Sequence, residues 1–240
     1  MKIDIIYEDD DLVIVNKPSG ILVIPDRFDN DLPSLNRILE TRYGCHMYVV
    51  HRLDRGTSGV ICFAKNEETH KYMSALFQEH QVEKYYMGLV GGRLIPESGT
   101  IESAIIAHPT KKGKMITAKK GKASKTDYEA VEQWPLYSLV RFRIYTGRTH
   151  QIRVHMQSIG HPIACDELYG DGQPFMLSTI KKKYNVAKDA EERPLMDRLA
   201  LHASKLVFTN AAGKEIVAEA PLPKDIAACV NQLNKWSKAV

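Results

Sequence analysis

The sequence His51-Arg52-Leu53-Asp54-Arg55-Gly56-Thr57-Ser58-Gly59 says most about how this chain folds, because it links two short apolar runs. These runs, 48–50 and 60–64, have the composition of buried strands. The polar stretch between them therefore lies where the backbone leaves a buried sheet. Binding and catalytic groups are commonly held at such places.

Asp54 stands between the guanidinium groups of Arg52 and Arg55. Two neighbouring cations favour the ionised carboxylate, which indicates a nucleophile or a base. An Arg-Asp pair beside a turn is also a common way to fix a loop, and Thr-Ser-Gly is an ordinary turn sequence. The local chemistry supports both interpretations about equally.

Two further motifs follow in order along the chain. They are Val82-Glu83-Lys84-Tyr85-Tyr86-Met87-Gly88-Leu89-Val90 and Gly147-Arg148-Thr149-His150-Gln151-Ile152-Arg153-Val154-His155-Met156, and Leu201-His202-Ala203 forms a last short block. With the first stretch, they resemble the signature, the tyrosine-bearing strand and the arginine-bearing motif of the RluA-type pseudouridine synthase family. The resemblance runs from about Tyr7 to Pro223, and it carries function by analogy.

The resemblance implies three catalytic residues. The family breaks the bond between uracil and ribose, turns the base and rejoins it through carbon, without cofactor or metal. Asp54 is then the nucleophile, or the base that starts an elimination by removing a ribose proton. Arg153 is expected to pair with Asp54 and keep it charged. Tyr86, rather than Tyr85, is expected to stack on uracil and assist proton removal from carbon 5.

Several basic side chains are predicted to bind RNA. By the resemblance, Arg52 enters the base stack that the flipped uridine leaves, and Arg55 lies beside it. Arg148 and Thr149 are predicted to contact phosphate near a helix start. The alternatives are a surface ion pair with Asp54 for Arg52, and simple helix capping for Arg148 and Thr149.

Lysines gather between positions 111 and 125. Those predicted to bind RNA are Lys111, Lys112, Lys114, Lys119, Lys120 and Lys122. With glycines among them, they predict a flexible basic loop, which suits an RNA backbone. A solvated lysine-rich hairpin without a partner is the alternative.

Length and composition are those of a globular protein. The 240 residues suffice for one large domain, or for two small ones fused along a shared sheet. We expect one catalytic domain over 1–240, with no separate N-terminal RNA-binding domain. Hydrophobic residues make up 44%, charged residues 26%, and the net charge is +4, so charge alone does not indicate nucleic acid.

The sequence also predicts where the protein works. No apolar run is long enough to span a membrane, and the first residues do not resemble a signal peptide. Cys45, Cys62, Cys165 and Cys229 are scattered, which indicates reduced thiols in the cytoplasm and no structural zinc. His150, His155 and His161 lie near Asp166 in sequence, but their spacing does not suit a metal site. We therefore expect these histidines to be hydrogen-bonding residues.

Strands outnumber helices in the predicted inventory. Strands are expected at 3–7, 12–16, 85–90, 100–106, 126–134 and 137–145, with a late hairpin at 205–209 and 215–220. Helices are expected at 34–43, 66–81, 149–158 and 224–236. Short turns and few strand-helix-strand crossovers predict an α+β protein with a mixed, largely antiparallel sheet. The resemblance implies the pseudouridine synthase fold, with a bent sheet and a central catalytic cleft flanked by helices.

The sequence as a whole predicts a cytoplasmic, monomeric pseudouridine synthase that needs no cofactor or metal. Its expected substrate is a uridine in structured RNA: a ribosomal RNA loop, a tRNA anticodon stem-loop, or both. Two alternatives stay open. One is a non-catalytic RNA-binding protein or chaperone with the same fold. The other is a glycoside hydrolase, which needs a partner carboxylate or a metal that the motifs do not supply.

Overall fold

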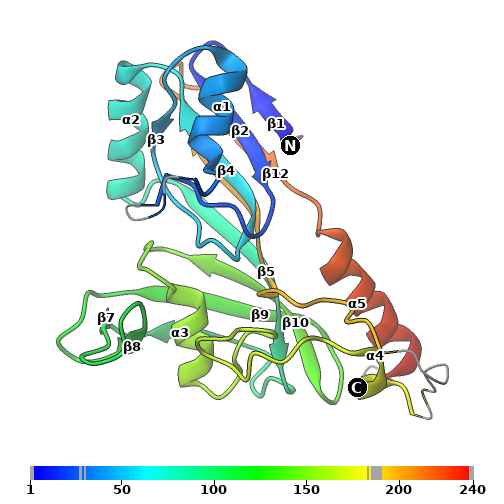
Figure 1. Cartoon of the computed structure of the whole chain (residues 1–240). Coiled ribbons are helices and arrows are strands. Elements are labelled where there is room, and N and C mark those ends of the chain that lie inside the picture. Colours follow the sequence, from blue (N-terminus) through cyan, green and yellow to red (C-terminus); the bar gives the residue numbers. More distant parts are fainter. Residues whose placement is uncertain (1–2, 27–28, 30, 183, 185–190, 238–240) are drawn as a thin grey trace. The chain divides into compact units, whose positions relative to one another are not determined.

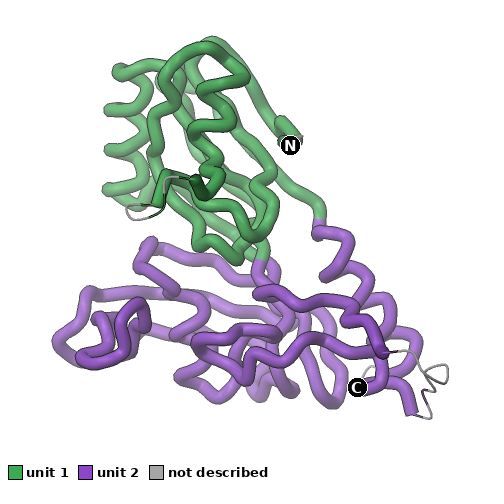
Figure 2. Tube along the Cα trace, viewed as in Figure 1, with its two compact units in different colours: residues 1–86, 202–221 green, residues 87–201, 222–240 purple. Residues whose placement is uncertain are grey.

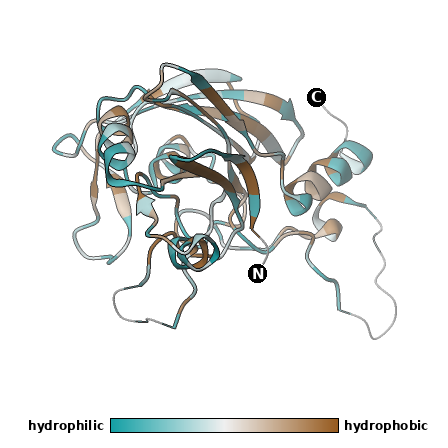
Figure 3. Cartoon of the chain, turned by 90° about the horizontal axis from the view of Figure 1, so that it is seen from above, coloured by the Kyte–Doolittle hydropathy of each residue, from teal (hydrophilic) through white to brown (hydrophobic). Residues whose placement is uncertain are grey.

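The computed structural model describes residues 3–26, 29, 31–182, 184 and 191–237 (Figure 1). The chain divides into two compact units, Met1–Tyr86 with His202–Pro221 and Met87–Leu201 with Leu222–Val240 (Figure 2). The apolar residues concentrate on the strands, whereas the helices carry both apolar and polar residues (Figure 3). The strands therefore supply most of the core.

The first unit is a sheet with one helix on each face. Its strands are β1 (Asp4–Glu8), β2 (Leu12–Lys17), β4 (Ser58–Ala64) and β11 (Leu201–Thr209), in that order, with β3 (Tyr48–Val49) on β4 and β12 (Glu215–Glu219) on β11. The pairing of β4 with β11 is parallel. The pairs of β1 with β2, β2 with β4, β3 with β4 and β11 with β12 are antiparallel.

Strand β4 is buried along its whole length because both of its faces are covered. Val60, Cys62 and Ala64 pack in one apolar cluster with residues of α2 (Glu67–Gln78). Ile61 and Phe63 point to the opposite face, where they pack with α1 (Leu35–Tyr43). This explains why the sequence shows a continuous apolar run here instead of an alternating one.

The second unit is built on an antiparallel sheet. Strand β5 (Glu83–Gly91) begins in the first unit, continues into the second, and is followed in the strand order by β10 (Tyr137–Ile144), β9 (Lys125–Gln133) and β6 (Ser98–Glu102). A separate two-stranded sheet joins β7 (Ile105–Ala107) to β8 (Met115–Thr117). The helices of this unit are α3 (Gln151–Ser158), α4 (Leu177–Ile180) and α5 (Lys224–Trp236).

The predicted fold class is confirmed: the sheet is mixed, mostly antiparallel, and accompanied by few helices. The predicted cap of α2 is also confirmed, since the side chain of Asn66 accepts a hydrogen bond from the Thr69 amide at 2.8 Å. None of the helices in the described ranges is long and apolar enough to cross a membrane.

Two local predictions are wrong. The strand expected at 100–106 breaks after Glu102 into β6 and β7, because the Ser103 amide turns to the carbonyl of Ser124. The helix expected from Thr149 begins at Gln151, and Thr149 does not cap it. His150 occupies the cap position in a left-handed conformation, with φ 57°.

Candidate active site

Asp54 lies half-buried in the loop between β3 and β4. The loop closes as a turn in which the Thr57 amide donates to the Asp54 carbonyl at 3.1 Å. Leu53 before the turn and Thr57 after it are both buried. The carboxylate is therefore carried by a turn whose two ends are fixed in the core.

The buried side chain of Lys17 holds this turn in place, a role that the sequence did not predict. Its side chain is fully buried, and the ammonium group donates to the carbonyls of Pro18 at 3.1 Å, Ile21 at 2.8 Å and Arg55 at 3.1 Å. An ammonium group has no acceptor capacity, so it suits a place where several carbonyls converge. A lysine that ends an apolar strand just before Pro-Ser-Gly was the available signal.

Arg55 also ties the turn to the segment after β2. Its Nε donates to the Gly20 carbonyl at 2.9 Å, and the Gly20 amide returns a bond to the Arg55 carbonyl at 2.8 Å. The Ser19 hydroxyl donates to the Gly56 carbonyl at 2.7 Å. Arg55 thus contributes to the shape of the loop, beyond the RNA contact that the sequence predicts for it.

Arg52 is exposed. Among the described residues, no hydrogen bond or ion pair holds its side chain, so the predicted alternative of an ion pair with Asp54 is not seen. The guanidinium group is therefore accessible for the RNA contact that the sequence predicts.

His51 anchors the start of the loop as a neutral imidazole. Its Nε2 accepts a hydrogen bond from the Cys62 amide at 3.0 Å, and its ring stacks on Phe77 with centroids 4.4 Å apart. Burial, together with the charge of Lys84, lowers the pKa of His51 to about 3. Burial also lowers the pKa of Lys84 to about 8. A neutral ring is what the bond from Cys62 requires.

The parallel contact between β4 and β11 supports the end of the same loop. Gly59 has φ +115°, and a Cβ there would lie 2.1 Å from the carbonyl oxygen of Ala203. One residue earlier, the Ser58 hydroxyl is bonded to Nδ1 of the buried His202 at 2.9 Å. The short 201–203 block of the sequence is therefore a structural partner of the Asp54 loop.

Tyr86 lies on β5 and is partly buried against the apolar cluster that includes Leu53. Burial first, and the negative charge of Asp54 second, raise the pKa of Tyr86 well above its usual range. The structure thus brings Tyr86 within electrostatic reach of Asp54. Tyr85 has a different neighbour, because its hydroxyl donates to Glu83 at 2.7 Å.

Arg153 lies on α3 and holds a buried carboxylate. Its Nε and one Nη donate to the two oxygens of Asp166 at 2.7 Å and 2.8 Å, and the Asp166 side chain is fully buried. One oxygen of Asp166 also accepts from the amides of Leu168 and Tyr169. The sequence analysis missed this role of Asp166. The pairing of Arg153 with Asp54 would join residues of the two units, and it stays a prediction.

The three histidines of the metal hypothesis make hydrogen bonds, as predicted. His150 is bonded to the Tyr169 hydroxyl, His155 to Ser124 and Thr126, and His161 to the Gly91 carbonyl. Within the described ranges, no group of three or more potential ligands is placed to hold a metal ion.

The first residues of the third motif form a hydrogen-bonded network at the start of α3. The Gln151 side chain accepts from the Arg148 amide at 3.1 Å and from the Thr146 hydroxyl at 2.7 Å. The Arg148 Nε donates to the Ala123 carbonyl at 3.1 Å. Thr149 is exposed, so its predicted phosphate contact remains open.

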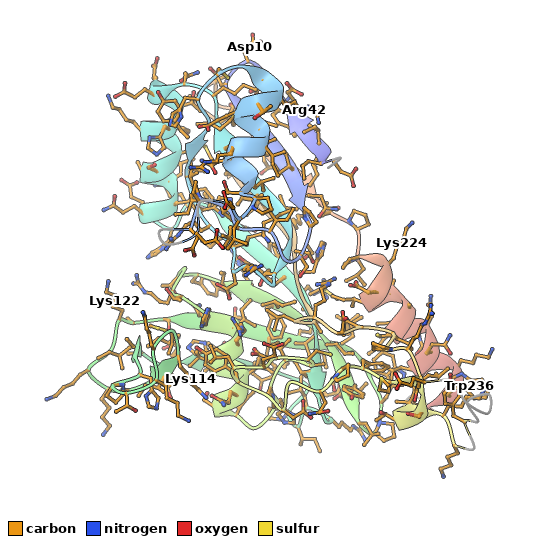
Figure 4. All side chains as sticks on the ribbon, in the orientation of Figure 1. Asp10, Arg42, Lys114, Lys122, Lys224 and Trp236 are labelled. Atoms are coloured by element: carbon orange, nitrogen blue, oxygen red, sulfur yellow. The ribbon has the colours of Figure 1, made fainter. Side chains whose placement is uncertain are left out.

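The lysine-rich segment is more ordered than predicted. Residues 105–122, called the basic hairpin from here on, contain β7, β8 and a second turn closed by paired bonds between Ile105 and Lys122. Figure 4 labels Lys114 and Lys122 on it. The exposed lysines are Lys111, Lys112, Lys119, Lys120 and Lys122. Lys114 differs, because its ammonium lies 5.3 Å from the Tyr169 ring centroid.

Two solved structures share this fold. Human RNA pseudouridylate synthase domain containing 1 has a TM-score of 0.73 at 27% identity, over 95% of this chain and 87% of that one. Human RNA pseudouridylate synthase domain containing 4 has a TM-score of 0.73 at 24% identity, over 96% and 93%, and shows the fold alone. The class defined by the fold is that of the pseudouridylate synthases.

The family follows from the sequence comparison. The model of the RNA pseudouridylate synthase family matches residues 11–158, and the chain belongs to this family. The resemblance to RluA-type enzymes that the motifs predict is thereby confirmed.

Several similar proteins carry the name ribosomal large subunit pseudouridine synthase D. That of Nitrosomonas europaea is 34% identical over 240 residues, covering 95% of this chain and 64% of that one. That of Neisseria meningitidis is 36% identical, covering 94% and 60%. That of Escherichia coli is 32% identical, covering 95% and 69%. The chain thus spans 60% to 64% of the length of the first two of these relatives.

Proposed function

We propose that this chain is an RNA pseudouridine synthase, an isomerase that converts specific uridines in structured RNA into pseudouridine. One observation carries the proposal: the carboxylate of Asp54 sits on a turn fixed in the core, within electrostatic reach of Tyr86, whose pKa is raised first by burial and second by that carboxylate's charge. The names of the relatives favour large-subunit ribosomal RNA as the first substrate to test. A tRNA stem-loop is the second.

Asp54 acts on the ribose in this proposal. As a nucleophile, it forms a bond to carbon 1′ while the glycosidic bond to nitrogen breaks. As a base, it removes the proton of carbon 2′ while the same bond breaks. In both cases the detached uracil turns, and carbon 5 then bonds to carbon 1′. On the first route this step breaks the bond between Asp54 and carbon 1′, and on the second route the protonated Asp54 returns its proton to carbon 2′. The proton of carbon 5 leaves, and a proton ends on nitrogen 1, so no group is gained or lost overall.

Tyr86 acts on the base. Because burial and the charge of Asp54 keep its phenol protonated, the hydroxyl can donate a hydrogen bond to the detached uracil. The same hydroxyl can relay the proton of carbon 5, accepting it while passing its own proton to the carboxylate. Its ring supplies a flat apolar surface for the base.

Arg153 would complete the site. Asp166 already holds Nε and one Nη in two parallel bonds, which fixes the plane of the guanidinium group. Since a guanidinium group carries five N–H donors, it can serve a second carboxylate or a phosphate. In the proposed site, that second partner is Asp54.

The remaining predictions belong to the same proposal. Arg52 would enter the stack vacated by the flipped uridine, while Arg55, Arg148, Thr149 and the exposed lysines of the basic hairpin would contact the RNA backbone. The protein would work as a single catalytic domain and a monomer in the cytoplasm, without cofactor or metal.

Tritium release from carbon 5 of labelled uridine tests the chemistry. Transcripts of large-subunit ribosomal RNA and of tRNA are incubated with the unchanged protein, with Asp54→Asn, and with Asp10→Asn as a control at an exposed position. We expect release from at least one transcript, loss of release in Asp54→Asn with RNA affinity within a few-fold, and no effect of the control. Turnover by Asp54→Asn would remove Asp54 from its role. Binding without any release would favour the non-catalytic RNA-binding alternative.

A further inference from the structure

Tyr169 lies where the basic hairpin meets the helix that carries Arg153. Its side chain is almost completely buried. The hydroxyl accepts a hydrogen bond from the Met115 amide of β8 at 2.8 Å, and it is bonded to Nδ1 of His150 at 2.8 Å. One phenol oxygen therefore joins the hairpin to the residue directly before α3.

The ring of Tyr169 is in contact with Arg153. The guanidinium carbon lies 4.9 Å from the ring centroid, within the usual range of a cation–π contact. The Asp166 carboxylate holds the same guanidinium group and also accepts from the Tyr169 amide at 3.1 Å. Asp166 and Tyr169 thus hold the guanidinium group of Arg153 from two sides, by an ion pair and by a cation–π contact.

The basic hairpin packs against Tyr169 and α3. Ile105 of β7, Val154 of α3 and Tyr169 form a small apolar cluster, with Met115 of β8 packed against it. A Cβ on Gly121 would lie 2.6 Å from the carbonyl carbon of Ile105, so the second turn of the hairpin also lies directly on β7. The exposed lysines therefore belong to a hairpin that is packed against α3 and Tyr169.

We propose that Tyr169 is a positioning residue that holds the basic hairpin at a fixed position relative to the guanidinium group of Arg153. An RNA backbone bound by the exposed lysines would then be held at a set distance from the guanidinium group. The inference rests on the proposed function, because it assumes that Arg153 serves the reaction. It adds that the hairpin, through Tyr169, sets where along the RNA the reaction takes place.

The variant Tyr169→Phe tests this directly, because it keeps the ring and removes only the hydroxyl. Tritium release is measured on two RNAs: the full large-subunit ribosomal RNA transcript, and the shortest fragment of it that the unchanged protein still converts. We expect the rate on the full transcript to fall about tenfold, in line with the loss of one buried hydrogen bond, and the rate on the fragment to change less than about twofold. The ratio of the two rates cancels any loss of folded protein.

Two further variants sharpen the test. Tyr7→Phe removes a hydroxyl that donates to Asp9 at 2.7 Å in the first unit, and it should leave the ratio unchanged. Gly121→Ala disturbs the hairpin from its other side and should lower the ratio as Tyr169→Phe does, even if the latter fails to fold. If Tyr169→Phe and Gly121→Ala lower the rates on both RNAs equally, or change neither rate, the inference about Tyr169 is wrong, while the proposed function still stands. No release by the unchanged protein from any transcript would overturn the proposed function, and the inference with it.

Discussion

The residues around Asp54 are fixed mainly through backbone groups. Lys17 and Arg55 bind carbonyls, and His51 accepts from an amide. Such bonds hold the turn through its main-chain groups. A turn held in this way has a defined backbone, which is what the catalytic role proposed for Asp54 requires.

Replacement of the Tyr86 hydroxyl should slow chemistry and spare binding. In Tyr86→Phe the ring still stacks on uracil, but the proton relay is removed, so we expect product formation to slow by about 10²-fold or more while RNA affinity changes little. Single-turnover tritium release and filter binding measure the two effects. Tyr85→Phe is the matched control, since its hydroxyl binds Glu83 on the same strand. An unchanged rate in Tyr86→Phe would make Tyr86 a packing residue.

His51 should make the protein sensitive to acid. Its pKa is about 3 in the folded chain and 6.5 when unperturbed, so the unfolded chain binds more protons between these values. The stabilisation is complete above about pH 6.5 and is lost as the pH falls towards 3, by at most about 5 kcal/mol at about 1.4 kcal/mol per pKa unit. His51→Gln, which stays neutral, should lose less stability between pH 7 and pH 4 in urea titrations. Parallel curves for the two proteins would contradict this.

At the scale of the elements, β4 and β11 approach each other closely beside the Asp54 loop. The two backbones meet at Gly59, where no side chain fits. The neighbouring bond between Ser58 and His202 then has a fixed geometry. The loop of Asp54 depends on this junction because β4 begins only four residues after it.

Gly59→Ala should therefore destabilise the first unit severely. The added Cβ would meet the Ala203 carbonyl at 2.1 Å, and the positive φ adds backbone strain. We expect a decrease of several kcal/mol in the free energy of unfolding, measured by urea denaturation. Gly147→Ala is the control, because a Cβ there meets nothing within 4 Å. Near-equal stability of the two variants would show that β11 can move away from β4.

The lysines of the basic hairpin should act through counterion release. The side chains of Lys111, Lys112, Lys119, Lys120 and Lys122 are exposed, and replacing these residues by Gln removes their positive charges from the surface. The slope of log affinity against log salt should become shallower by about 0.7–0.9 for each RNA phosphate that the variant no longer neutralises. Gln at the exposed Lys71 and Lys214 of the first unit is the comparison, and it should leave the slope unchanged. A slope that stays the same in the hairpin variant would mark these lysines as solvent-facing.

At the scale of the whole molecule, the sequence predicts the fold class and candidate reactive residues, but not the residues that hold those candidates in place. Asp54 and Tyr86 stand in local motifs, and alternation along β10 marks its buried face. The supporting roles of Lys17, Asp166 and Tyr169 were not predicted, because the partners of these residues are distant in sequence or are backbone groups, which leave no pattern. The packing of the basic hairpin was also not predicted. Its lysines indicate an exposed segment, whereas the contact is made by Ile105 and Met115.

The parallel pairing of β4 with β11 has a consequence for the making of the protein. Ser58 and His202 are 144 residues apart, so a ribosome delivers β4 long before its partner. At about 5–20 residues per second, this delay is roughly 7–30 s. Through that interval Ser58 and Gly59 at the start of β4 have no β11 beside them. The first unit can therefore finish folding only after residues 87–201 of the second unit have been translated.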